Sequence, residues 1–148
     1  MTSAIRDANI FSDAWKVFFA KVNSVSDPNG KSKWVYGAFP EKAIQNTSSY
    51  PLIVVSPVEP SYDPLTFRNV KRGPLRVSVD VYSTRVEELD TVSDSITNTF
   101  ETNENDGSFG LSGVHSMSLI SSPYSFFSRD SLRIHNRTLV YEFDYGWH

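Results

Sequence analysis

The fold of this chain is decided by one stretch of strict alternation, Leu75-Arg76-Val77-Ser78-Val79-Asp80-Val81-Tyr82. Successive side chains of a β-strand point to opposite faces, so the four apolar residues share one face and the residues between them share the other. The pattern predicts a strand with one buried face. The second face is expected to be exposed to solvent or covered by a partner.

A helix is predicted directly after this strand. Thr84 and Glu87 fit a capping box, in which the threonine caps the helix and the glutamate lies at its third position. Apolar residues then recur at helical spacing, which predicts a helix over about residues 85–101. Acidic residues are expected on its solvated face, where those of the first turn complement the helix dipole: Glu87, Glu88, Asp90 and Asp94.

Before the alternating strand, the sequence predicts a buried strand and a protrusion. Tyr50–Pro57 is the densest β-branched run of the chain and predicts a strand buried on both faces. Pro57, Pro60 and Pro64 interrupt the residues that follow. A protruding hairpin or loop is therefore expected over about residues 56–74.

The N-terminal part predicts a second helix and a short strand. Apolar residues at spacings of three and four trace one helical face over about residues 4–25, and Ser26–Gly30 supplies the turn that ends it. Trp34–Phe39 predicts a short aromatic strand. Pro40–Gln45 is compatible with one helical turn, because proline is favoured at the first helical position.

The C-terminal part predicts a flexible loop over about residues 103–113, a strand over Val114–Ser122 and a closing strand over Leu132–Tyr145. Tyr124–Phe127 is aromatic, with no pattern that assigns it to an element. Apolar residues before and after Asn136 have opposite parity, so a β-bulge is expected there. The order helix, strands, helix, strands predicts one α+β domain over residues 1–148, with a mostly antiparallel sheet packed against two helices.

Composition excludes several classes of function. The chain has no cysteine, which excludes disulfides, thiolate catalysis and cysteine-based metal centres. Its net charge is −3 with both signs interspersed, unlike the basic footprint of a nucleic-acid-binding protein. The first residues lack the basic and apolar regions of a secretory signal, and no apolar run approaches the roughly 20 residues that span a bilayer.

The sequence contains no catalytic or metal-binding pattern. His115, His135 and His148 do not have the spacing of metal ligands. A metal site made of His115, His135 and a distant aspartate requires the two strands to pair, and solvent-facing histidines are the simpler interpretation. No nucleophile elbow or phosphate-binding loop occurs, so we expect no enzyme activity and no cofactor.

One local basic and aromatic cluster is our candidate protein interface. Three interpretations are open: a solvated hairpin edge that blocks aggregation, a hairpin that docks on an acidic protein partner, and a nucleic-acid patch. The cluster consists of Tyr62, Phe67, Arg68, Lys71, Arg72 and Arg76.

The order of these segments resembles that of a known family. An amphipathic N-terminal helix precedes the aromatic strand Trp34–Phe39 and a Tyr-Pro-hydrophobic strand, Tyr50–Val55. A proline-interrupted hairpin then leads to the basic-Gly strand Arg72–Ser83, a capped helix and two closing strands, the last over Arg137–Phe143. In this layout the chain resembles the tail-terminator, or tail-completion, proteins of long-tailed bacteriophages.

This resemblance implies a structural role in the virion. It implies a homohexameric ring that caps the tail tube, ends tube polymerisation and joins the tail to the head connector. The implied partners are further copies of the chain, the tail tube protein and the head-completion or connector protein. DNA would pass through the lumen without sequence-specific binding. The protein would be made in the host cytoplasm, with no membrane contact, cofactor or catalytic residue.

Three alternatives stay open. A neck or head–tail connector protein has the same physical requirements as a terminator. A small-ligand binding module would use the aromatic residues Trp34, Tyr36 and Tyr82 as a pocket. An enzyme would use His115 and His135 with a carboxylate.

Overall fold

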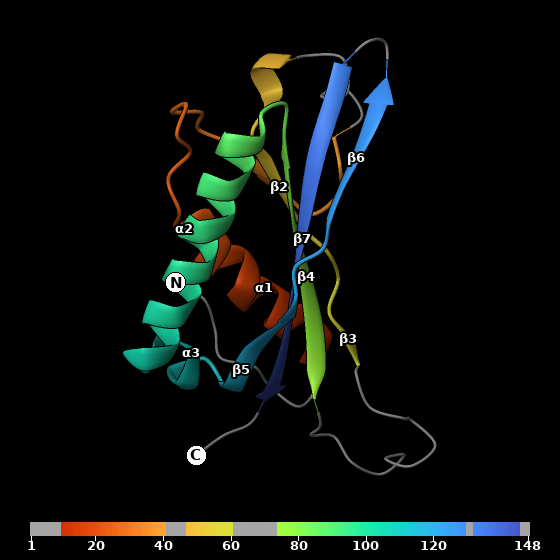
Figure 1. Cartoon of the computed structure of the whole chain (residues 1–148). Coiled ribbons are helices and arrows are strands. Elements are labelled where there is room, and N and C mark those ends of the chain that lie inside the picture. The colour runs from red at the N-terminus through yellow and green to blue at the C-terminus, as the bar shows by residue number, and fades with distance from the viewer. Residues whose placement is uncertain (1–9, 41–46, 61–73, 130–131, 146–148) are drawn as a thin grey trace.

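The structure is a computed structural model that describes residues 10–40, 47–60, 74–129 and 132–145. Over these ranges the chain forms a mixed, mostly antiparallel seven-stranded sheet with helices against it (Figure 1). The predicted α+β class is confirmed. No helix in these ranges is long and apolar enough to cross a membrane.

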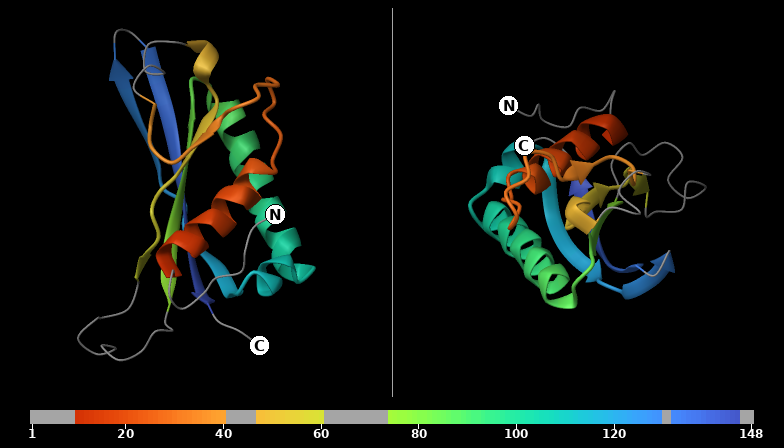
Figure 2. Two further views of the ribbon diagram at one scale, coloured as in Figure 1. Left: turned by 180° about the vertical axis from the view of Figure 1, so that it is seen from behind. Right: turned by 90° about the horizontal axis from the view of Figure 1, so that it is seen from above.

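The sheet has the strand order β1-β2-β4-β7-β5, with β3 also paired to β4 and β6 also paired to β7. Figure 2 shows both long helices, α1 and α2, on the same side of this sheet. The described elements, in chain order, are α1 (Ile10–Asn23), β1 (Val35–Tyr36), the 3-10 turn η3 (Thr47–Ser49), β2 (Leu52–Val55), β3 (Glu59–Pro60), β4 (Leu75–Ser83), α2 (Val86–Asn105), α3 (Ser108–Leu111), β5 (Val114–Ser121), β6 (Tyr124–Arg129) and β7 (Leu132–Tyr145).

The antiparallel pairing of β4 with β7 forms the middle of the sheet. Its register is continuous from Leu75 opposite Phe143 to Ser83 opposite His135. The predicted alternation of β4 is confirmed, because Leu75, Val77, Val79 and Val81 are fully buried while the residues between them are exposed or half-buried. The buried face of this pair lies under the helices.

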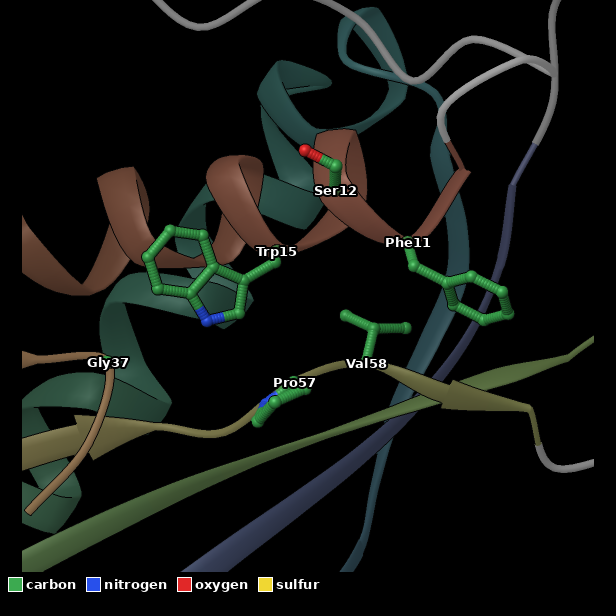
Figure 3. A pocket seen from close by; sticks show the side chains of 6 residues that line it. All are labelled: Phe11, Ser12, Trp15, Gly37, Pro57 and Val58. Carbon is green, nitrogen blue, oxygen red and sulfur yellow. The ribbon is translucent and has the colours of Figure 1, made fainter.

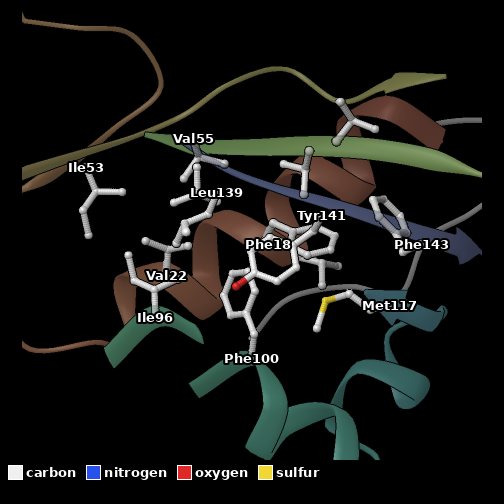
Figure 4. Close-up of a cluster of buried hydrophobic side chains, with 14 of the residues drawn as sticks. Phe18, Val22, Ile53, Val55, Ile96, Phe100, Met117, Leu139, Tyr141 and Phe143 are labelled. Atoms are coloured by element: carbon white, nitrogen blue, oxygen red, sulfur yellow. The ribbon is translucent and has the colours of Figure 1, made fainter. Parts of the chain in front are cut away.

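The main core fills the space between the sheet and the helices (Figure 4). Phe18 of α1 lies at its centre, with its ring centroid 4.7 Å from that of Phe143, 5.4 Å from that of Phe109 and 5.7 Å from that of Phe100. These four rings come from α1, α2, α3 and β7. The aromatic cluster therefore joins all three helices to the central strand.

A second, smaller core lies on the opposite face of the sheet. It buries Tyr50, Leu52, Val54 and Ile134, with half-buried aromatic residues around them. The prediction that the strand after Tyr50 is buried on both faces is confirmed, because all four residues of β2 are buried. Leu52 and Val54 belong to the second core, and Ile53 and Val55 belong to the main core.

The bulge expected near Asn136 is wrong. The register of β7 against β4 and against β6 runs through Asn136 without a shift. The parity of the apolar residues changes because Ile134 faces the second core and Leu139 faces the main one. The register shifts occur in β5 instead, where Ser116 has a positive φ of 52°.

The capping box predicted at the start of α2 is also wrong. Arg85, not Thr84, is the N-cap residue, and no side chain caps the helix there. Ser83 Oγ instead accepts a hydrogen bond from the Arg85 backbone N–H (3.1 Å) and donates one to Glu88 Oε1 (2.9 Å). Glu88 is therefore 8% exposed, although it was expected on the solvated face with Glu87.

Several predicted boundaries changed. The helices run over Ile10–Asn23 and Val86–Asn105, and residues 1–9 lie outside the described part. The loop predicted over 103–113 holds the end of α2 and all of α3, because Phe109 anchors α3 in the core. All but the first residue of the turn predicted at 40–45, and most of the protrusion predicted at 56–74, lie outside the described residues.

We predict that Phe18→Ala destabilises the protein by about 3–5 kcal/mol, because it empties the centre of the aromatic cluster. Phe11→Ala is the matched control, since Phe11 lies in the same helix and is 49% exposed. Urea denaturation followed by circular dichroism measures both variants. Equal stability loss in the two would contradict the placement of the core.

Candidate functional site

Of the six residues that the sequence suggests as a protein interface, the structure describes one, Arg76. Tyr62, Phe67, Arg68, Lys71 and Arg72 lie outside the described residues. Arg76 is exposed on β4, on the sheet face opposite the helices, and its Nε lies 3.1 Å from Glu142 Oε2 of β7. An exposed ion pair of this kind contributes little to stability.

The structure separates the histidines that a metal site would need. His115 lies opposite Asp144 in the β5–β7 pair, and His135 lies nine residues before Asp144 on β7. At ~3.3 Å per residue, the two histidines are roughly 30 Å apart. His148 lies outside the described residues, within which no group of His, Cys, Asp and Glu could hold a metal ion.

The three aromatic residues expected to form a ligand pocket are not brought together. Trp34 is buried in the main core, whereas Tyr36 and Tyr82 pack against the second core on the other face. The sheet itself lies between the two groups.

Three of the exposed large apolar side chains among the described residues lie together on a strand that the sequence left unassigned. Tyr124–Phe127 begins β6, which pairs with residues 132–137 of β7. We call β6 and these six residues the aromatic hairpin. Tyr124 is 44% exposed, Phe126 53% and Phe127 38%, values unusual for large apolar side chains in a strand.

Cationic side chains alternate with the rings on one face of the aromatic hairpin. The Arg137 guanidinium carbon lies 5.9 Å from the Tyr124 ring centroid, and that of Arg133 lies 4.7 Å from the Phe126 ring centroid. His135 lies between them, stacked on Tyr124, with its Nδ1 2.5 Å from the tyrosine hydroxyl. These cation–π contacts hold a basic and aromatic surface in one arrangement.

The other face of the hairpin joins the second core. Phe127 lies 6.5 Å, centroid to centroid, from both Phe39 and Tyr82. Burial raises the pKa of the Tyr82 phenol to about 12, with further contributions from the charges of Asp80 and Tyr50. Phe127 is thus an anchor, whereas Tyr124 and Phe126 face outward.

The backbone of β6 also has an open edge. One edge is hydrogen-bonded to β7, and none of the other described strands pairs with the second edge. Natural proteins usually protect such edges with charge, proline or a bulge, because an open apolar edge binds other chains. The sequence signal was the alternation of Tyr124, Phe126 and Ser128 beside two arginines of the following strand.

A long groove runs between α2 and β5. It consists of two adjoining hollows of about 410 and 170 Å³, which share Thr97 and Leu119. Helix α2 contributes mainly polar side chains together with Phe100, and Arg137 lines one end of the groove. Leu119, Leu139 and Tyr141 contribute apolar surface. We call this the acidic groove, and its rim is formed by Asp90, Asp94, Thr97, Glu101 and Glu104.

An open apolar pocket of about 390 Å³ lies beside α1 (Figure 3). Phe11, Trp15, Pro57 and Val58 are the apolar side chains among the residues that line it. The Trp15 indole N–H donates to the Val55 carbonyl at 2.9 Å, which fixes the ring against β2. A Cβ at Gly37 would lie 3.2 Å from the Trp15 ring, so the backbone passes close to the indole there.

Comparison with known proteins does not assign the chain to a family. No protein-family model matches the chain, and no curated protein matches it.

The pKa of Tyr82 predicts a pH dependence of stability. A phenol with a pKa near 10 in the unfolded chain and about 12 in the folded one binds its proton more tightly when folded. Its contribution is complete below pH 10 and is lost as pH rises through about 12. We expect the free energy of unfolding to fall over this range, and to fall less in Tyr82→Phe.

Denaturant titrations at a series of alkaline pH values measure this difference. Tyr141 also has a raised pKa because of burial, and it cancels in the comparison because it is present in both proteins. The charge of Tyr50 contributes to the raised pKa of Tyr82, so Tyr82→Phe removes this coupling together with the phenol itself. Parallel curves for the two proteins would show that Tyr82 ionises as freely in the folded state as in the unfolded one.

Proposed function

We propose that this chain is a structural virion protein that forms a ring on the tail tube of a long-tailed bacteriophage. The ring ends tube polymerisation and joins the tail to the head connector. Its partners are other copies of the chain, the tube protein and a head-completion protein, and DNA passes through the lumen without being read.

The observation that carries this proposal is the aromatic hairpin. A ring made of one protein needs a heterologous contact, in which one surface of each copy meets a different surface of the next. Tyr124 and Phe126 provide outward-facing rings of the type enriched at interface cores. The open edge of β6 adds main-chain donors and acceptors that a neighbour can pair with.

The segment order described from the sequence supports the choice of family. In the structure, β1, β2 directly after Tyr50-Pro51, β4, the helix α2 and the closing β7 occur in that order, whereas Arg72-Gly73 lies outside the described residues. A neck or head–tail connector protein would need the same ring contact, so it is the alternative within the assembly class.

A small-ligand binding module is the alternative outside that class. The apolar pocket beside Trp15 favours it, because its volume of about 390 Å³ falls within the range of ligand sites. Its lining offers few polar groups to orient a ligand. Among the described lining residues the side-chain donors are the Ser12 hydroxyl and the Trp15 indole N–H, and the indole N–H already donates to the Val55 carbonyl. We therefore prefer the assembly function.

Mass photometry and negative-stain microscopy test the proposal. We expect the purified chain to form closed rings as its concentration rises, and to bind the end of assembled tail tubes. A strict monomer at every concentration that also fails to bind tubes would contradict it.

We predict that Phe126→Ser weakens ring formation by about tenfold or more, because truncating an interface hot spot costs about 2 kcal/mol or more and each ~1.4 kcal/mol is tenfold. Leu111→Ser is the matched control, since Leu111 is 87% exposed on α3, away from the hairpin. Ring formation is measured by mass photometry across a dilution series. The same loss in both variants would show that the hairpin has no special role.

A further inference from the structure

We propose that the aromatic hairpin of one copy docks into the acidic groove of the next copy. The inference rests on the proposed ring function, and it names the two surfaces that meet in the ring contact. Three independent properties of the described residues support this pairing: charge, length and position along β7.

The first property is charge on the groove side. Helix α2 carries six acidic residues over Val86–Asn105 and no lysine or arginine. Glu88 is bound by Ser83 and Arg85, and Asp90 pairs with Arg137 of its own chain at 3.3 Å. Three exposed acidic residues remain along the groove rim: Asp94, Glu101 and Glu104. None of them forms an ion pair with another described residue.

The hairpin carries the opposite charge. Arg133 is exposed and lies over the Phe126 ring, without an ion pair to any other residue in the described ranges. Its ring partner keeps the guanidinium at the surface, where it is available to a carboxylate. Charge complementarity of this kind favours the pairing of the hairpin with the groove over the pairing of two hairpins.

The Arg137–Asp90 pair shows that the two surfaces fit chemically. Arg137 donates through Nη1 to the Ser122 carbonyl at 2.9 Å and through Nη2 to Asp90 Oδ1 at 3.3 Å. It therefore joins a hairpin residue to the groove rim within one chain. Arg133 repeats this chemistry four residues earlier on β7, where its own chain places no carboxylate among the described residues.

The second property is length. From Asp90 to Glu104 the helix rises ~1.5 Å per residue, so the acidic rim spans about 21 Å. Strand β6 has six residues and rises ~3.3 Å per residue, so it spans about 20 Å. An extended strand therefore covers the whole groove.

The third property is position. Residues 132–137 of β7 pair with β6, whereas Val140–Tyr145 pair with β5, which forms the floor of the groove. The hairpin and the groove follow one another along one strand, and Arg137 at the base of the hairpin lines the end of the groove in its own chain. Tyr124, Phe126 and Arg133 lie further along the hairpin and are not among the residues that line the groove. A second copy can place these residues in the groove, and repeating the contact produces a head-to-tail assembly, which is the type of contact that a ring of identical chains needs.

Charge reversal with mixing of two variants tests the docking. Arg133→Glu makes the hairpin acidic, and the double variant Asp94→Lys/Glu101→Lys makes the groove rim basic. We expect each protein alone to form rings at least about tenfold less readily than the wild type, because like charges then face each other. An equimolar mixture should regain rings in which the two variants alternate, since each reversed surface then meets its complement.

Two variants elsewhere serve as controls for the change in net charge. Lys16→Glu lies on the exposed side of α1, and Glu59→Lys lies on β3 at the other side of the sheet. We expect both to form rings like the wild type, alone and when mixed. Circular dichroism of all variants checks that they fold, and rescue in the mixture excludes misfolding as the cause of a loss.

The outcomes separate this inference from the proposed function. If both charge-reversed proteins still form rings as readily as the wild type does, the docking is wrong but the proposed ring function is not contradicted. Loss of rings that mixing does not restore would also overturn the docking. A wild-type chain that neither forms rings nor binds tail tubes would overturn the proposed function itself.

Discussion

The antiparallel pairing of β4 with β7 is the constraint on which the rest of the structure depends. Its uninterrupted register places Val77, Val79 and Val81 beside Leu139 and Tyr141 on one face. That face must be covered, because these side chains remove large apolar areas from water when they are buried. Helices α1, α2 and α3 cover it, and their positions follow from the Phe18 cluster that packs on β7.

The length of β7 explains why the aromatic hairpin is exposed. β7 has 14 residues, and on the side away from β4 two strands share it, β5 along its C-terminal half and β6 along its N-terminal part. The main core includes β7 residues from Leu139 to Tyr145, so it does not extend to the part that pairs with β6. Tyr124 and Phe126 consequently lack a cover from their own chain among the described residues. Their burial by another copy would supply the missing apolar contact.

Local patterns predicted much of the fold because they reflect which face of an element is buried. The alternation in β4, the doubly buried β2 and the bounds of β7 all follow from periodicity. The errors arose where side chains of one element are buried by more than one part of the structure. A parity change at Asn136 means a bulge in a sheet with one core, but here it marks the boundary between two cores on opposite faces. Likewise, Glu88 was assigned to solvent because its buried partner, Ser83, belongs to the preceding strand.

The candidate site was less predictable than the fold. Sequence reasoning selected the basic cluster from Tyr62 to Arg76, where charge is concentrated in the chain. The aromatic hairpin escaped it because exposure is a tertiary property: Tyr124 and Phe126 have the composition of core residues. The acidic groove escaped for a related reason, since its rim on α2 and its floor on β5 meet only in the folded chain.

Hydrogen–deuterium exchange, measured at concentrations below and above ring formation, tests whether the aromatic hairpin is the contact between copies. We expect amide exchange to slow in β6 and along the α2 residues of the acidic groove when rings form. Exchange in α1, whose buried face packs inside each copy, should stay the same. Rings whose formation leaves the exchange of β6 unchanged would contradict the assignment of the aromatic hairpin as the contact between copies.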